Sequence, residues 1–126
     1  MDAENPEELS YIIIGILFEV YNELGFGYQE KYYYRSIKNK LLTRGLKVEE
    51  QLLSRILVEN KIIGRYFLDF LVSDSKDKIV LEIKVANEVY PQHIRQVLGY
   101  LKNNNLKLGL VAAFSKHGVI VKRVIN

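Results

Sequence analysis

The sequence predicts an α/β fold of the α+β kind, a mixed β-sheet flanked by helices with the element order α-α-β-β-β-α-β-β. Three observations predict it. Two amphipathic segments open the chain, a long run of strand-forming residues fills its middle, and one further amphipathic segment precedes two more strand-like runs. Each of these elements has an apolar side, so we expect the helices and the sheet to pack as layers around a shared core.

The first helix is expected over Leu9 to Leu24, where apolar residues recur at helical spacing and Gly25 follows the last of them. The second fits about Gln29 to Thr43 and ends before Gly45. Its run of three tyrosines is interpreted as packing. The third opens at Pro91, a residue favoured in the first turn, and carries an apolar stripe at Ile94, Val97, Leu98 and Leu101.

Five strands are expected around these helices. Polar turns separate the first three strands from one another, and a turn at 116–118 that contains His117 separates the last two. His117 is interpreted as a residue of a solvated loop. The predicted strands are Val48–Val58, Ile62–Ser73, Ile79–Ala86, Leu106–Phe114 and Val119–Ile125.

The chain has 126 residues and shows no repeat or linker, so residues 1–126 are expected to form one domain, with 1–8 a loosely ordered N-terminus. The net charge of +3 permits an anionic partner such as nucleic acid without requiring one. The absence of cysteine excludes disulfides and thiolate metal sites. An acidic start, unlike a signal peptide, and the lack of an apolar run of about 20 residues predict a soluble cytoplasmic protein without a membrane partner.

Two charged residues interrupt the apolar strand V-L-E-I-K-V at 80–85. Because side chains alternate across a strand, Glu82 and Lys84 share one face. A symmetric hairpin turn centred between Ser75 and Lys76 would place Asp69 directly opposite Glu82, with Cβ atoms about 5 Å apart. The neighbours of Asp69 in the strand are expected on the face opposite to its side chain.

Two carboxylates at this separation repel each other unless one is protonated or a cation lies between them. Mg²⁺ prefers oxygen ligands and is typically held by one or two carboxylates together with water and phosphate. The alternative is a salt bridge from Lys84 to Asp69 or Glu82 without any chemistry. Burial of unpaired charge is costly, so the apolar setting of the strand favours a functional site.

This Asp…Glu-x-Lys arrangement resembles the PD-(D/E)xK nuclease superfamily. The run G-Y-Q-E-K-Y-Y at 27–33 fits the pattern G-x-x-E-x-x-Y of the GxxExxY family, a branch of that superfamily, and the resemblance extends from about Leu9 to the C-terminus. It implies a restriction-endonuclease-like fold. Many members have proline where this chain has Phe26, and the superfamily's usual proline before its first acidic residue is replaced by Leu68.

By this resemblance, Asp69, Glu82 and the backbone carbonyl of Ile83 would hold Mg²⁺, with Mn²⁺ as a substitute. Glu30 corresponds to an extra acidic residue beside the metal. Lys84 would orient the attacking water and stabilise the charge that develops on the phosphate. On the third helix, Gln96 and Tyr100 match a Q-x-x-x-Y pattern that contacts nucleic acid in RecB-type relatives, and His93 shares their face; a polar helix flank is the alternative.

The expected function is therefore a metal-dependent endo- or exonuclease that hydrolyses DNA, less readily RNA, with structural or weak sequence selectivity. The similar-sized archaeal Holliday-junction resolvases work as dimers, which makes a homodimer an expectation from the resemblance. The alternative is a catalytically silent nuclease-fold module that binds nucleic acid or a partner protein. A nucleotide-binding regulator is disfavoured because Gly25-Phe26-Gly27 lacks the features of a phosphate-binding loop.

Overall fold

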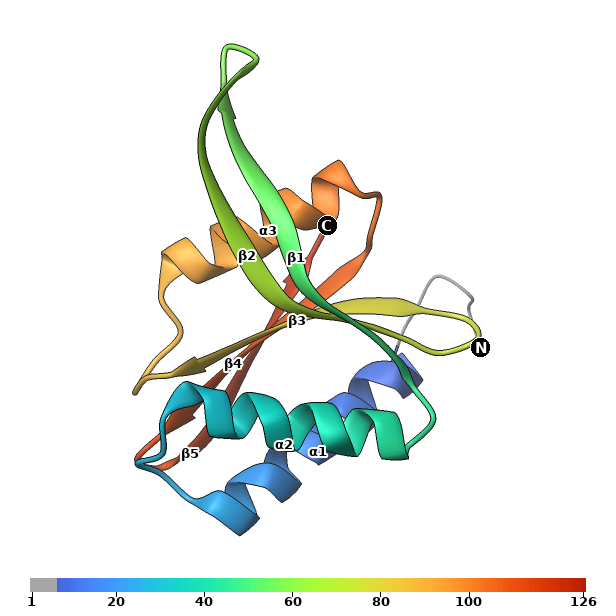
Figure 1. Cartoon of the computed structure of the whole chain (residues 1–126), viewed down its shortest axis with the longest axis vertical. Helices are drawn as coiled ribbons and strands as arrows, with labels where there is room; N and C mark the ends of the chain where they lie inside the picture. Colours follow the sequence, from blue (N-terminus) through green and yellow to red (C-terminus); the bar gives the residue numbers. More distant parts are fainter. Residues whose placement is uncertain (1–6) are drawn as a thin grey trace.

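The computed structural model of the chain describes residues 7–126, and its elements follow the predicted order (Figure 1). The mixed sheet flanked by helices is confirmed. No helix in this part of the chain is long and apolar enough to span a bilayer. The elements are α1 (Glu7–Leu24), α2 (Glu30–Thr43), β1 (Lys47–Val58), β2 (Lys61–Ser73), β3 (Lys78–Val85), α3 (Pro91–Asn103), β4 (Leu108–Ser115) and β5 (Gly118–Ile125).

The five strands form one sheet in the order β1-β2-β3-β4-β5. Neighbouring strands are antiparallel except β3 and β4, which are parallel and are joined through α3. A parallel pair needs such a crossover because a tight turn can only reverse the chain. Helices α1 and α2 cover one face of the sheet and α3 lies on the other (Figure 1).

Helix α1 begins at Glu7, two residues before the predicted start at Leu9. Glu7 and Glu8 occupy its first turn, where the partial positive charge of a helix N-terminus favours acidic side chains. The expectation of a loosely ordered segment therefore does not hold for these two residues, and residues 1–6 lie outside the described part of the chain. Gly25 follows the helix with φ of 70°, the left-handed conformation that ends many helices.

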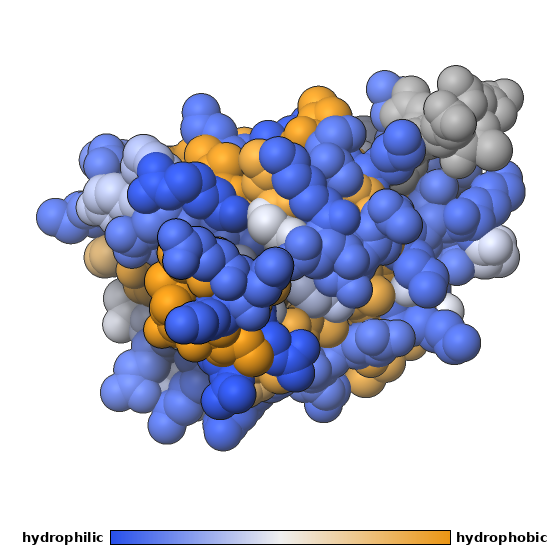
Figure 2. Space-filling view, turned by 90° about the horizontal axis from the view of Figure 1, so that it is seen from above, coloured by the Kyte–Doolittle hydropathy of each residue, from blue (hydrophilic) through white to orange (hydrophobic). Residues whose placement is uncertain are grey.

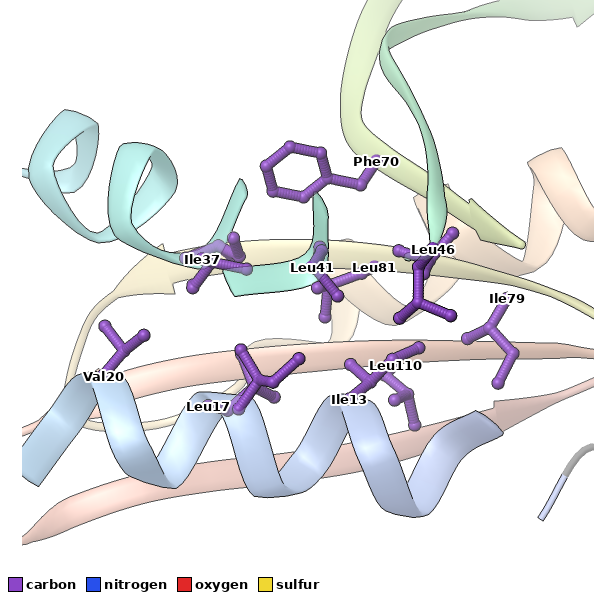
Figure 3. Packing of buried hydrophobic residues seen from close by; sticks show 14 of the residues in the cluster. Ile13, Leu17, Val20, Ile37, Leu41, Leu46, Phe70, Ile79, Leu81 and Leu110 are labelled. Carbon is purple, nitrogen blue, oxygen red and sulfur yellow. The ribbon is translucent and has the colours of Figure 1, made fainter. Parts of the chain in front are cut away.

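The larger core lies between the sheet and the α1–α2 pair, and apolar side chains of both helices point toward the strands (Figure 3). Tyr33, the tyrosine of the G-x-x-E-x-x-Y pattern, is fully buried there. Its ring stacks on Phe114 at a centroid distance of 4.5 Å, and its hydroxyl donates a hydrogen bond of 2.5 Å to the carbonyl of Gly25. Tyr33 therefore holds the loop before α2 in place, and its interpretation as a packing residue is confirmed. The neighbouring Tyr32 is 43% exposed.

A smaller cluster fills the space between the sheet and α3, which begins at Pro91 as predicted. Gly109 of β4 allows the helix to approach closely. A Cβ atom on this residue would lie 2.4 Å from Cγ1 of Val97, far inside van der Waals contact. The glycine thus sets the distance between α3 and the central strands.

The β1–β2 hairpin projects beyond the rest of the molecule (Figure 1). Its two-residue turn, Glu59-Asn60, has positive φ at both positions, the geometry that suits the twist of paired strands. Viewed from above, the surface shows apolar patches among mostly hydrophilic side chains (Figure 2). The exposed large apolar side chains of the hairpin are Leu53, Ile56, Leu57, Val58, Ile62, Ile63 and Phe67.

Candidate active site

The site lies at a fork between β2 and β3. The two strands pair from Ser73 opposite Lys78 to Phe70 opposite Leu81, which confirms the predicted register. The four-residue turn is held by Asp74, whose Oδ1 accepts hydrogen bonds from two backbone amides of the turn. Beyond Phe70 and Leu81 no further pair of the β2–β3 ladder forms among the described residues. We call this point the strand fork.

Two carboxylate side chains replace the backbone ladder at the strand fork. The backbone N–H of Asp69 donates to Oε1 of Glu82 at 3.1 Å, and the N–H of Ile83 donates to Oδ2 of Asp69 at 2.7 Å. Each carboxylate therefore accepts a hydrogen bond from a backbone N–H of the opposite strand. In a regular ladder a backbone carbonyl would accept that bond. The arrangement brings Asp69 and Glu82 together at the end of the paired region.

Glu82 is almost fully buried, with 2% of its surface exposed. Burial, a hydrogen bond with the Asp69 side chain and the charge of Asp69 raise the pKa of Glu82 to about 9. Lys84 lowers it, but its Nζ lies 3.8 Å from Oε2 of Glu82, at the outer limit of an ion pair. A salt bridge to Lys84 thus exists, and it leaves the repulsion between the two carboxylates largely uncompensated.

Glu30 is the first residue of α2 and approaches the strand fork from this helix. Burial raises its pKa, as does the charge of Asp69, whereas Lys84 and the backbone amide of Val85 lower it. These influences place Glu30 beside Asp69 and Lys84. Within residues 7–126, however, no three acidic, histidine or cysteine side chains gather closely enough to hold a metal ion. Glu30 is thus a neighbour of Asp69, with which it lines one surface groove.

The donor set at the strand fork fits a hard divalent cation. Asp69 and Glu82 present carboxylate oxygens, and Ile83, whose carbonyl is the third candidate ligand, directly follows Glu82 in the chain. Two carboxylates, completed by water and substrate phosphate, are a typical protein contribution to a Mg²⁺ site. The raised pKa of Glu82 indicates that, without a cation, the pair of Asp69 and Glu82 is most stable when it retains a proton. A divalent cation could take the place of that proton.

A surface groove of about 620 Å³ leads to Asp69 along α2. Tyr34 stacks on Phe70 and donates a hydrogen bond of 2.7 Å to Oε1 of Glu50, and Gln51 in turn donates to the Tyr34 hydroxyl at 3.4 Å. Burial is the main cause that raises the pKa of Tyr34 to about 12. The groove is lined by Glu30, Lys31, Tyr34, Arg35, Lys38, Gln51 and Asp69.

Gln51 is a site residue that the sequence pattern did not reveal. It lies between the pairs Glu50–Phe70 and Leu52–Leu68, and so opposite Asp69, with φ of 54°. This left-handed conformation is unfavourable for a residue with a side chain. Hairpin register could have placed Gln51 opposite Asp69, but no residue type here signals the unusual backbone.

The irregular backbone at Gln51 also corrects one expectation. Leu68 and Phe70 were expected on one face, opposite the side chain of Asp69, yet Leu68 packs in the cluster under α3 and Phe70 in the cluster under α1 and α2. Strand alternation is broken at this point because the residue opposite Asp69 departs from extended geometry. At this break the carboxylate of Asp69 faces the backbone of β3, where it accepts the hydrogen bond from the N–H of Ile83.

Substitution of Gln51 tests this strain. Gln51→Val is expected to destabilise the fold by about 1–2 kcal/mol, because a β-branched side chain tolerates positive φ least. Gln51→Gly is expected to unfold at the same or a higher urea concentration than the wild type, since glycine adopts this conformation freely. Urea unfolding followed by circular dichroism measures both. Equal stability of the two variants would mean that the positive φ at Gln51 stores no strain.

The residues predicted on α3 divide between two places. His93 is buried, and burial together with the charge of Lys84 lowers its pKa, so it lies toward the strand fork. Its Nδ1 has no hydrogen-bond partner within the described chain. Gln96 instead lines a second groove, of about 370 Å³, between α3 and the β1–β2 hairpin, together with Arg55 and Arg95.

Tyr100 is half-buried against the cluster under α3. Burial raises its pKa, and so does the charge of Glu49 on β1. The hydroxyl of Tyr66, on β2, donates a hydrogen bond of 2.6 Å to the backbone carbonyl of Gln96, which ties α3 to the hairpin. His117 lies exposed in the turn between β4 and β5, as predicted.

Comparisons with known proteins agree with this geometry. A family model described as the PD-(D/E)XK nuclease superfamily matches residues 7–124. The crystal structure of SSO0001 is similar with a TM-score of 0.59 at 17% identity; the match covers 96% of this chain and 60% of that one. This chain thus spans well under two thirds of SSO0001.

A second similar structure is that of Archaeoglobus fulgidus Hjc, described as a Holliday junction resolvase from an archaeal hyperthermophile. Its TM-score is 0.50 at 12% identity, over 75% of this chain and 76% of that one. At such identities the two structures show a shared fold. No curated protein matches the sequence.

Proposed function

Because the chain belongs to the PD-(D/E)XK nuclease superfamily, we propose that it is a Mg²⁺-dependent nuclease that hydrolyses phosphodiester bonds of DNA. One observation carries the proposal. Asp69 and Glu82 bind across the strand fork within hydrogen-bond distance of each other's strands, and Lys84 lies beside them. A fold without chemistry at this point would have no reason to bury Glu82 against a second carboxylate.

In the proposed site, Asp69, Glu82 and the carbonyl of Ile83 hold the cation, which supplies Lewis-acid polarisation of a phosphoryl oxygen. Glu30, at the start of α2 beside Asp69, would contribute a further carboxylate to the cation. The ammonium of Lys84 orients the attacking water and stabilises the charge that accumulates on the phosphate. His93, whose pKa the charge of Lys84 lowers, is proposed to contact nucleic acid beside that lysine.

The finer assignments are part of the same proposal. We propose membership of the GxxExxY family, for which Gly27, Glu30 and Tyr33 supply the pattern, a single domain over residues 1–126, DNA preferred to RNA, Mn²⁺ as a substitute and a cytoplasmic location. Hjc is described as a Holliday junction resolvase, so branched DNA is a substrate class to test.

We also propose a homodimer. The exposed apolar side chains of the β1–β2 hairpin support self-association, because a monomer would leave this apolar surface in water. Gln96 and Tyr100 are proposed to contact nucleic acid from the groove beside this hairpin.

The decisive experiment incubates the purified chain with labelled single-stranded, duplex and branched DNA and with RNA, in Mg²⁺, Mn²⁺ or EDTA. We expect cleavage of at least one DNA substrate with either metal and none in EDTA. Metal-independent binding without cleavage of any substrate would contradict the proposal and indicate a silent nuclease-fold module.

A further inference from the structure

Two exposed tyrosines flank Glu30 at the start of α2. Tyr28 is 49% exposed and Tyr32 is 43% exposed, and their rings meet edge to face at a centroid distance of 6.0 Å. Tyr28 also makes an edge contact with the buried Tyr33, at 6.4 Å. Tyr28 thus packs on the buried Tyr33, and both exposed rings remain open to solvent. We call Tyr28 and Tyr32 the tyrosine pair.

Two cations accompany the tyrosine pair. Lys31 Nζ lies 5.2 Å and Arg35 Cζ 5.9 Å from the centroid of the Tyr32 ring, both within the range of a cation–π contact. Neither forms a salt bridge with a carboxylate in the part of the chain that the structure describes. By contrast, Lys38, one turn further along the same side of α2, pairs with Glu50 at 2.9 Å. Lys31 and Arg35, near the start of α2, thus combine positive charge without a salt bridge among the described residues with an exposed aromatic ring.

These cations connect the tyrosine pair to the strand fork. Lys31 and Arg35 line the same groove as Glu30 and Asp69, and in an α-helix residues four apart lie on one side. A phosphate backbone that follows Lys31 and Arg35 therefore runs from the carboxylate pair to the aromatic rings. Its negative charge complements Lys31 and Arg35, and the ring of Tyr32 lies within cation–π distance of both.

We infer that the tyrosine pair binds unpaired bases of a single-stranded nucleic-acid segment next to the phosphate at the strand fork. The faces of bases in a duplex are covered by their neighbours, whereas an unpaired base can stack on an aromatic side chain. The site therefore takes substrates with a single-stranded portion: ends, flaps or unpaired arms. This inference rests on the proposed nuclease function and specifies its substrate class.

Fluorescence anisotropy in EDTA, where no cleavage occurs, tests the inference with the full chain. The probes are a labelled single-stranded DNA of about 12 nucleotides, within the range of single-strand sites, and a duplex of equal length. The wild type is expected to prefer the single strand. Tyr28→Ala/Tyr32→Ala should weaken single-strand binding about tenfold or more and leave duplex binding unchanged.

Two further variants separate stacking from folding and from charge. Tyr28→Phe/Tyr32→Phe keeps both rings and should bind the single strand like the wild type. Tyr11→Ala removes an 81% exposed tyrosine on α1 and is the matched control, with no expected effect. Lys31→Gln/Arg35→Gln should lower the slope of log affinity against log salt by about 0.7 for each charge removed, which the tyrosine variants should not do.

The outcomes distinguish this inference from the proposed function. Cleavage by the wild type together with unchanged single-strand binding in Tyr28→Ala/Tyr32→Ala overturns the inference and leaves the nuclease function standing. Single-strand binding that depends on the tyrosine pair, without metal-dependent cleavage, supports the inference and overturns catalysis. Absence of binding to both probes overturns the inference, and the cleavage assay in Mg²⁺ then decides the nuclease function separately.

Discussion

Glu82→Gln is expected to lower metal-dependent DNA cleavage by about a thousandfold and to leave the fold intact. Glutamine has the size of glutamate, and its carbonyl can still accept the hydrogen bond from the backbone N–H of Asp69. Its amide can donate to the Asp69 carboxylate, which replaces the proton shared by the pair. What the substitution removes is the negative charge that a divalent cation needs at this position.

Single-turnover cleavage of a labelled oligonucleotide measures this loss, and circular dichroism verifies the fold. Lys84→Met should lower the rate by about a hundredfold, since it removes one group that stabilises the developing charge. Glu59→Gln at the exposed hairpin tip and Lys76→Met in the exposed β2–β3 turn are the matched controls and should cleave like the wild type. An undiminished rate in Glu82→Gln would place the reaction elsewhere in the protein.

The second large effect concerns stability in the absence of metal. The pKa of Glu82 rises from its ordinary value of 4.5 to about 9 in the folded state. Between these values the unfolded chain releases a proton that the folded chain retains, so the folded state binds more protons. The contribution of Glu82 to the free energy of unfolding is therefore complete below about pH 4.5 and is lost as pH rises toward 9.

Urea unfolding in EDTA at intervals from pH 5 to pH 9 measures this loss as the difference between the wild type and Glu82→Gln. The difference is needed because the lowered pKa of His93 acts in the opposite direction within the same range. We expect the wild type to lose stability relative to Glu82→Gln as pH rises.

Addition of Mg²⁺ should raise the free energy of unfolding of the wild type most strongly at high pH. The cation binds the deprotonated pair, and this pair is assembled only in the folded state. Glu82→Gln should show no such gain. Parallel pH profiles of the two proteins in EDTA would mean that Asp69 and Glu82 do not share a proton.

Much of the fold follows from local patterns. Helix α1 ends just before Gly25, because glycine readily adopts the left-handed conformation that follows a helix. Helix α3 begins at Pro91, because proline suits the first turn of a helix. The register of β2 and β3 was predictable because a four-residue turn leaves few ways to pair two strands of alternating character. For this reason the proximity of Asp69 and Glu82 could be expected from the sequence.

Other features of the site depend on segments distant in sequence. The position of Gln96 in the groove beside the hairpin follows from how α3 lies against the hairpin, with Tyr66 bonded to its backbone. Helical spacing placed Gln96 and Tyr100 on one face with His93, but spacing cannot state which part of the sheet that face meets. The open groove beside Arg55 is likewise a product of packing.

Local patterns were sufficient to predict the element order, the paired carboxylates and the lysine beside them, because short turns and strand alternation act over a few residues. Long-range packing brings Glu30 of α2 to this pair, gives Gln51 its positive φ opposite Asp69, and buries Glu82. The burial of a side chain, the charges around it and the strain of its backbone depend on contacts between segments distant in sequence, which no local pattern encodes. They convert two acidic residues in a hairpin into a site in which charge is costly without a cation.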